Sequence, residues 1–176
     1  MEALGLFLKH LRQPEYVHVL LNPLPVYGLA MGVVGMVVAF ILRERRAMAV
    51  ALAVVFVGAL SAWPVVFSGH RGYDRVYAMS GEDAQQWLDV HEERAESFLP
   101  LYLTTAALAA VAFFSQLKWP RLGKPVTWLV LLLALASLGA GGWISQAGGQ
   151  VRHSEFRDGP PPADAAAGHE EEHQAR

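Results

Sequence analysis

Hydrophobic residues are gathered into four long runs that short polar stretches separate. The runs cover residues 24–42, 47–69, 97–117 and 125–149, and none of them contains a charged residue. A bilayer core about 30 Å thick needs roughly 20 mostly apolar residues in a helix to cross it. Lipid offers no partners to backbone polar groups, so such segments form helices. The pattern predicts an all-α protein with four transmembrane helices.

Two segments at the ends of the chain follow other patterns. Within residues 1–15 the apolar positions recur at helical spacing, at Ala3, Leu4, Phe7, Leu8 and Leu11. This periodicity predicts a short amphipathic helix at the membrane interface. Residues 158–176 begin with an aspartate, a glycine and three prolines and continue mainly in Ala, Glu and His, which predicts a disordered acidic tail. Residues 16–157 are then the membrane domain.

Residues 70–96 form the predicted outer loop between the second and third spans. Ser80 and Asp83 have the spacing of a helix capping box, with Asp in place of the usual Glu. Residues 83–96 contain neither glycine nor proline. We therefore expect the third span to begin as a helix well outside the membrane and to bend at Pro100.

Basic residues in the short links predict the orientation. The first two spans are joined by Arg43-Glu44-Arg45-Arg46, and the last two by a link that contains Lys118, Arg121 and Lys124. Short basic loops stay in the cytoplasm. Both termini and the outer loop are therefore predicted outside, in the periplasm if the membrane is a bacterial inner membrane. Short links also favour an up-and-down four-helix bundle.

Composition and motifs narrow the function classes. Only 17% of the 176 residues are charged, below the roughly 25% of soluble domains, as a membrane protein requires. A net charge of -2 gives no case for nucleic-acid binding, and the absence of cysteine excludes disulfides and thiolate chemistry. No phosphate-binding glycine loop, zinc-protease motif or serine nucleophile elbow is present. The sequence leaves open whether the protein is an enzyme.

Small residues repeat along the spans. Gly28, Gly32 and Gly35 lie on nearly the same helix face, the arrangement that lets two membrane helices approach closely. Alanines and glycines also recur in the third and fourth spans. The simpler interpretation is that these small residues let the helices pack closely. The alternative is that some of the glycines leave room for a flat cofactor.

Four histidines, one beside each span, fall near the predicted outer membrane face: His18, His70, His91 and His153. Neutral imidazole is a common ligand of metals and of haem iron, and bundles hold such cofactors with side chains from facing helices. We therefore expect two of the four to bind b-type haem or a divalent metal. Taken singly, each is also explained as a surface histidine.

Charged neighbours add two further hypotheses. Arg71, Arg94 and Arg152 stand beside these histidines and could pair with haem propionates, or form ordinary ion pairs with nearby Asp and Glu. In the tail, His169 and His173 have the i, i+4 spacing of a metal site on a helix. Zinc or copper would suit such histidine and carboxylate ligands.

At these residues the chain resembles a family of small four-helix bacterial inner-membrane proteins that is known as a domain of unknown function. That family opens on His-Pro-x3-His-Phe-Pro and closes on Gly-Gly followed by Arg-His-Gly. The matching positions here are His18, Pro25, His91, Gly148, Gly149, Arg152 and His153, while Pro23 stands where the family has its second histidine. The resemblance covers most of residues 18–153 and implies the four-helix fold and an association with haem.

Three hypotheses about function follow. The first is a small redox protein or redox-complex subunit that binds b-type haem and exchanges electrons with quinone or a periplasmic carrier. The second is a non-catalytic scaffold or assembly factor that binds other membrane subunits. The third is a zinc- or copper-binding membrane protein.

Overall fold

The computed structural model describes residues 2–159, without the side chains of residues 2, 3, 117, 118 and 120–122. Its elements are α1 (Glu2–His10), α2 (Pro14–Leu21), α3 (Pro23–Leu42), α4 (Arg45–Leu60), α5 (Ala62–Ala78), α6 (Glu82–Lys118), α7 (Pro120–Arg152) and the short 3-10 helix η1 (Ser154–Phe156). Four stretches are long and apolar enough to cross a membrane: Pro14–Leu42, Arg45–Ala78, Glu82–Gln116 and Gly123–Arg152. The predicted all-α class and the four membrane-length helices are confirmed.

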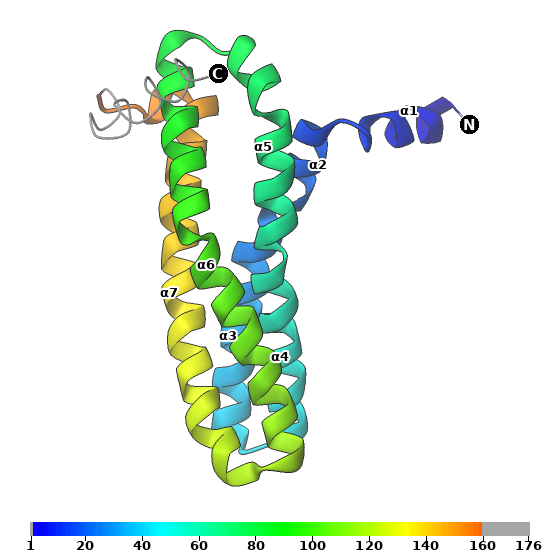
Figure 1. The fold of residues 1–176 in the computed structure, drawn as a ribbon, viewed down its shortest axis with the longest axis vertical. Helices are drawn as coiled ribbons and strands as arrows, with labels where there is room; N and C mark the ends of the chain where they lie inside the picture. The colour runs from blue at the N-terminus through cyan, green and yellow to red at the C-terminus, as the bar shows by residue number, and fades with distance from the viewer. Residues whose placement is uncertain (1, 160–176) are drawn as a thin grey trace.

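The long helices form two hairpins that pack together at one end (Figure 1). The first hairpin comprises α2 to α5, and the second comprises α6 and α7. The end where the hairpins pack together is the closed end. There α3 packs on α4 and α6 packs on α7, and contacts of α4 with α6 and of α3 with α7 join the two hairpins. Toward the other end, α2 packs on α5, and the hairpins separate (Figure 1). This end is called the open end below.

The core lies in the closed end. Leu29, Met36, Leu52, Val55 and Val130 are fully buried there, and α6 contributes small buried alanines. Large apolar side chains cover the outside, as lipid contact requires. Four tryptophans on this surface are each more than half exposed: Trp63, Trp119, Trp128 and Trp143.

Glycines bring α3 and α4 into backbone contact. A Cβ atom added to Gly28 would lie 2.8 Å from the Cα atom of Gly58, and one added to Gly32 would lie 2.5 Å from Cγ2 of Val55. At Gly35 the Cβ atom would lie 3.1 Å from Cβ of Ala51. The predicted face of small residues therefore packs one helix on another, and these three glycines make no room for a cofactor.

Residues 70–96, predicted as an outer loop, are helical except for a short connection. The helix α5 continues to Ala78 and α6 begins at Glu82, so only residues 79–81 connect them. Hydropathy placed the end of the span at residue 69 because the following residues are polar. Their polar side chains instead contact α6, as when Tyr73 donates a hydrogen bond to Asp89. The expectation that the third span starts as one continuous helix outside the apolar run is confirmed by α6.

Helix ends differ from the sequence patterns in two places. The capping box at Ser80 and Asp83 does not form, because Gly81 is the N-cap of α6 and makes no side-chain cap hydrogen bond. Ser80 instead donates to the carbonyl oxygen of Val76 at 2.8 Å and ends α5. At the C-terminal end, α7 stops at Arg152, before Gly159. Residues 160–176 of the tail, which include the candidate ligands His169 and His173, lie outside the described residues.

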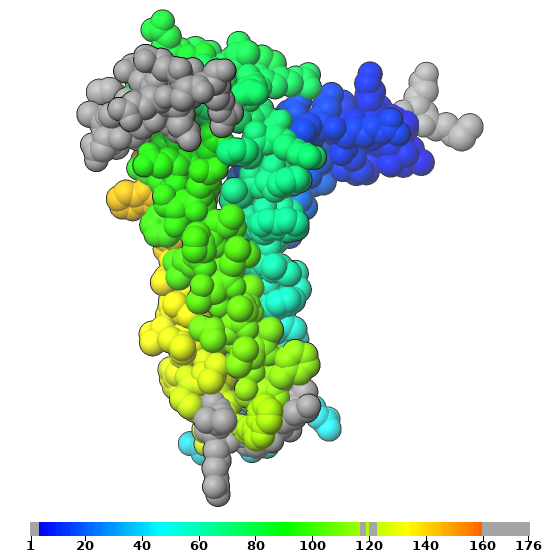
Figure 2. Space-filling view, viewed as in Figure 1, coloured from blue at the N-terminus to red at the C-terminus, as the bar shows by residue number. Residues whose placement is uncertain are grey.

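Two local features match the sequence. Pro100 lies inside α6, which changes direction along its length (Figure 1), as expected where proline removes a backbone hydrogen bond. The helix α1 stands out from the side of the bundle (Figure 2). Its apolar side chains Leu4, Leu6 and Leu8 are each more than half exposed.

Substitution of Gly58 by alanine tests the backbone contact between α3 and α4. The new methyl group would meet backbone atoms of Gly28 and Leu29 at 2.8–2.9 Å, and backbone cannot move aside cheaply. We expect Gly58→Ala to lower the free energy of unfolding by about 1–3 kcal/mol, measured by denaturant unfolding in detergent. Gly139→Ala is the matched control, because a Cβ atom there meets nothing within 4 Å. Equal stability of the two variants would contradict the packing.

Candidate cofactor site

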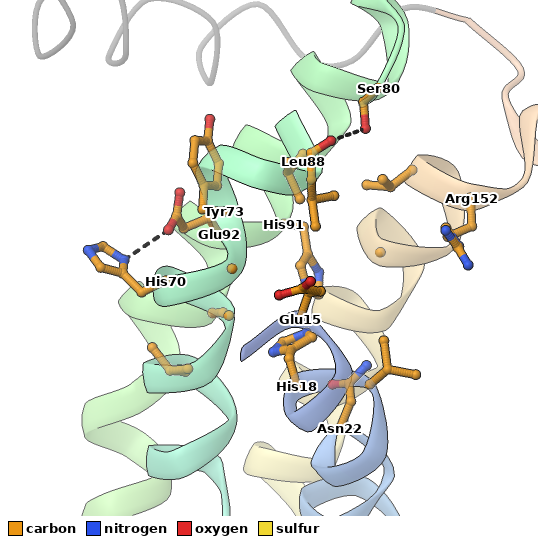
Figure 3. Close-up of a pocket in the computed structure, with 18 of the residues that line it drawn as sticks. Glu15, His18, Asn22, His70, Tyr73, Ser80, Leu88, His91, Glu92 and Arg152 are labelled. Carbon is orange, nitrogen blue, oxygen red and sulfur yellow. Dashed lines mark hydrogen bonds and ion pairs between the residues drawn. The ribbon is translucent and has the colours of Figure 1, made fainter. Parts of the chain in front are cut away.

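A cavity of about 730 Å³ lies between the two hairpins at the open end. This volume falls within the roughly 300–1,000 Å³ of ligand sites in proteins. Residues of α2, α5, α6 and α7 line it, and so do all four histidines singled out in the sequence, His18, His70, His91 and His153. The structure thus brings together side chains from four separate parts of the chain (Figure 3).

His18 is fixed by the helix that packs against it. Its Nδ1 atom lies 2.9 Å from the carbonyl oxygen of Val65 on α5. A carbonyl oxygen only accepts, so Nδ1 donates and Nε2 keeps its lone pair. The ring rests on Gly69, where a Cβ atom would come within 2.9 Å of Nδ1. The α5 backbone therefore sets both the tautomer and the position of this imidazole.

His91 has the same arrangement in the second hairpin. Its Nδ1 atom lies 3.0 Å from the carbonyl oxygen of Ile144 on α7. A Cβ atom on Gly148 would come within 3.0 Å of Cε1 of the ring. In both hairpins the accepting carbonyl and the glycine are four residues apart, at Val65 and Gly69 in one and at Ile144 and Gly148 in the other. Each hairpin therefore contributes one imidazole held in the same way.

These two rings meet in the cavity. The ring centroids of His18 and His91 are 6.1 Å apart, and the ring planes are nearly perpendicular, at 87°. Both side chains project into the space between the hairpins (Figure 3). Because each Nδ1 atom is engaged by a carbonyl, the Nε2 atom is the available ligand on both rings.

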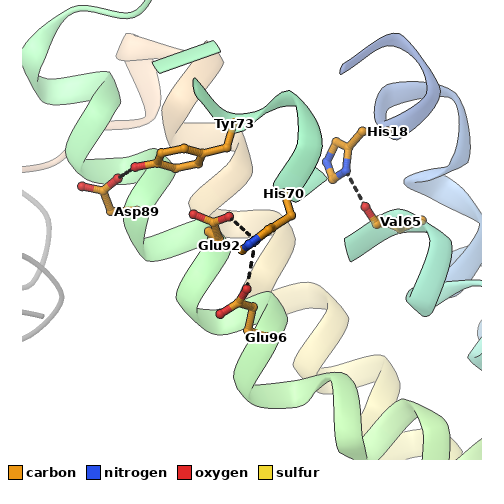
Figure 4. Close-up of polar contacts among 7 residues, drawn as sticks. All are labelled: His18, Val65, His70, Tyr73, Asp89, Glu92 and Glu96. Atoms are coloured by element: carbon orange, nitrogen blue, oxygen red, sulfur yellow. Dashed lines mark hydrogen bonds and ion pairs between the residues drawn. The ribbon is translucent and has the colours of Figure 1, made fainter. Parts of the chain in front are cut away.

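The other two histidines are engaged by carboxylates. Nδ1 of His70 lies 2.9 Å from Glu92 and 3.1 Å from Glu96, apart from the His18 ring (Figure 4). His153 is exposed, stacks on Phe156 and hydrogen-bonds Glu155 at 3.0 Å. The backbone N–H of Glu155 and this imidazole hold the pKa of the Glu155 carboxyl below its usual range. These two rings therefore have local partners outside the central pair.

The three candidate arginines lie in different places. Arg152 lines the cavity, whereas Arg71 covers the ring of Phe67 at 4.5 Å. Arg94 donates to the carbonyl oxygen of Trp143 at 2.9 Å and lies over its indole. Arg152 is thus the one member of this set that lines the cavity.

Most of the remaining cavity wall is apolar or glycine, including Val19, Val66, Gly72, Val76, Leu88, Ala95, Gly149 and Val151. An apolar cavity with a few placed polar groups is typical of sites for apolar cofactors. Glu15 adds a carboxylate at the wall, and it is paired with Arg75 at 2.5 Å.

Sequence reasoning missed the groups that fix the imidazoles. The acceptors are backbone carbonyls of Val65 and Ile144, and any residue type offers a carbonyl. Gly69 and Gly148 carry a weak signal, since each follows a branched apolar residue by four positions and lies near the end of a span. That spacing alone is too common in membrane helices to identify a site.

The hydrogen bonds predict one tautomer for both central histidines. In the protein purified without added cofactor, ¹⁵N-labelled histidine spectra should show a proton on Nδ1 and none on Nε2 for His18 and His91, because only Nδ1 faces a carbonyl oxygen. Gly148→Ala should shift the His91 signals and leave those of His18 unchanged, since the added methyl group displaces only the His91 ring. Protons on Nε2 in the parent protein would contradict the assigned contacts.

Comparison with known proteins identifies no relative of this chain. No family model, no curated protein and no solved structure matches the chain. The likeness to the four-helix family of unknown function therefore stays a prediction from short motifs. The support for a function therefore comes from the positions and contacts of the chain's own residues.

Proposed function

We propose that this chain is an integral membrane protein that binds one b-type haem between its two hairpins and transfers electrons. His18 and His91 would hold the haem iron through their Nε2 atoms. The observation that carries the proposal is the pair of imidazoles that face one cavity, each with Nδ1 bonded to a backbone carbonyl. Metal-bound histidine usually donates its other ring nitrogen to such an acceptor.

The spacing of the two rings supports shared coordination. If two imidazoles held one metal ion from opposite sides through bonds of about 2.0–2.1 Å, their ring centroids would lie roughly 6 Å apart. The observed separation is 6.1 Å.

The small number of protein ligands favours haem over a bare metal ion. Among the residues that the structure describes, the one group of three or more metal-binding side chains is His70, Glu92 and Glu96, which excludes both central rings. A structural zinc site needs four ligands. Haem brings four nitrogens of its own and needs two from the protein, and a haem held by two histidines would supply one-electron redox chemistry.

The cavity wall suits this cofactor. Its apolar residues from α2, α5, α6 and α7 would cover the macrocycle, and Arg152 at the rim would pair with a propionate. Arg71 and Arg94 are bound elsewhere and take no part in this proposal. Quinone or a periplasmic carrier would exchange electrons with the haem.

We place the open end of the bundle outside the cytoplasm, in a bacterial inner membrane. The basic residues Arg43, Arg45, Arg46 and Lys124 lie in or beside the short links at the closed end, and short basic links stay in the cytoplasm. An up-and-down bundle then puts both termini and the cavity on the periplasmic side. The helix α1, with its exposed apolar face, lies on the outer leaflet.

Absorption spectra test the cofactor. We expect the full chain, purified in mild detergent from cells supplied with a haem precursor, to show the sharp reduced bands of six-coordinate b haem. His18→Ala and His91→Ala should each lower the bound haem at least tenfold or give a five-coordinate spectrum, because one axial ligand is lost.

Two controls make this result specific. His153→Ala removes a histidine that lines the same cavity but pairs with Glu155, and it should leave the spectrum unchanged. His91→Gly with added imidazole should recover the six-coordinate bands if the ring acts as a ligand. A parent protein without haem would overturn the proposal and favour the rival function, a scaffold that binds other membrane subunits.

The orientation has a separate test, made simple by the absence of natural cysteine. Gly81→Cys places a thiol at the open end, where a Cβ atom meets nothing within 4 Å. Glu44→Cys places one in the exposed link between α3 and α4. A membrane-impermeant maleimide should label the first variant in intact cells and the second only after lysis. The reverse pattern would invert the topology.

A further inference from the structure

A second cluster of metal-binding side chains lies at the edge of the cavity, between α5 and α6. His70 projects from α5 toward two glutamates of α6 (Figure 4). Its Nδ1 atom lies 2.9 Å from an oxygen of Glu92 and 3.1 Å from an oxygen of Glu96. The ligating atoms of all three residues lie within 4.8 Å of one another. The central pair His18 and His91 takes no part in this cluster.

We propose that His70, Glu92 and Glu96 bind a divalent transition-metal ion such as Zn²⁺. The site takes one imidazole nitrogen and two carboxylate oxygens from the protein and leaves a fourth position for water. Transition-metal ions such as Zn²⁺ accept this mixture of nitrogen and oxygen ligands, whereas Mg²⁺ and Ca²⁺ favour sites made of oxygen alone.

The distances fit a tetrahedral ion after a small outward shift. Bonds of about 2.0–2.2 Å put neighbouring ligands of a tetrahedral zinc roughly 3.3–3.5 Å apart. Both carboxylate oxygens now lie slightly closer than this to the His70 nitrogen. Glu92 and Glu96 are four residues apart on α6, so they share one helix face. His70 and Glu96 are more than half exposed, so rotation of these side chains would open the site.

Exposure makes the cluster reachable from water. The side chains of His70 and Glu96 are 59% and 51% exposed, whereas that of Glu92 is 17% exposed. An ion can therefore enter from the surface and meet one carboxylate that the fold holds in place. The fold also fixes the two helices nearby, because Tyr73, one turn beyond His70, donates a hydrogen bond to Asp89.

The charge of this helix face favours a cation. Asp89, Glu92 and Glu96 occupy positions i, i+3 and i+7 of α6, so three carboxylates follow one another on the side that faces α5 (Figure 4). Like charges at this spacing repel. A divalent ion bound by Glu92 and Glu96 would relieve that repulsion.

A bound ion would also connect the two hairpins. His70 belongs to the first hairpin, and both glutamates belong to the second. Coordination would hold α5 against α6 beside the cavity and so stabilise the open end. This site is independent of the proposed haem ligands, and the two sites can fail separately.

Zinc titration of the purified full chain tests the proposal. His169→Ala and His173→Ala are introduced in every sample, so that the histidines of the tail do not compete. After metal removal, Zn²⁺ is titrated against a chromogenic chelator. We expect one ion per chain, and at least tenfold weaker binding in His70→Ala and in Glu96→Gln, because each removes one of three protein ligands.

His153→Ala is the matched control, since it removes an exposed histidine that contacts a single carboxylate. It should leave zinc affinity unchanged. Saturating Zn²⁺ should also raise the thermal unfolding midpoint of the parent and not that of His70→Ala. Equal zinc affinity in all variants, or equal binding of Mg²⁺ and Zn²⁺, would overturn the site and leave an ion pair. His18→Ala should lose haem and keep zinc, which separates the two proposals.

Discussion

Helices inside a bilayer gain little by leaving lipid for one another, so their association depends on how closely they pack. In this protein, glycines allow the helices of the first hairpin to pack closely. Gly28 and Gly58 bring α3 and α4 into backbone contact, and Gly72 lets the backbone of α2 approach α5. The same close approach recurs where Gly69 and Gly148 meet the two central imidazoles. Packing of the hairpins and placement of the histidines therefore have one physical basis.

The two hairpins repeat one design around the cavity. Each offers a histidine from its first membrane-length stretch to a carbonyl on its second, with glycine one turn beyond the acceptor. The helical stretches that carry His18 and His91 run in the same direction (Figure 1). A ligand between His18 and His91 would thus have similar surroundings on its two sides. It would also require both hairpins, so that binding and assembly of the open end are coupled.

Beyond the apolar core, polar contacts hold the helices together. The closed end is filled by Leu29, Met36 and Leu52, whereas α5 and α6 meet near the open end through His70 and Glu92 and through Tyr73 and Asp89. These contacts explain why α5 continues beyond its apolar run. Side chains that hydropathy assigns to a loop form the polar face of a helix, because their partners lie on the neighbouring helix.

The sequence by itself determined the all-helical class, the four membrane-length helices and the position of one histidine near the same end of each. Hydropathy and helical periodicity depend on residues that are near one another in the sequence, so they can be recognised without the tertiary structure. Only the tertiary structure decided that α5 extends through residues first assigned to a loop, and that His18 faces His91. The acceptors that fix those rings are backbone carbonyls 47 and 53 residues away. A carbonyl is common to every residue, so no pattern along the chain marks which one a histidine will meet.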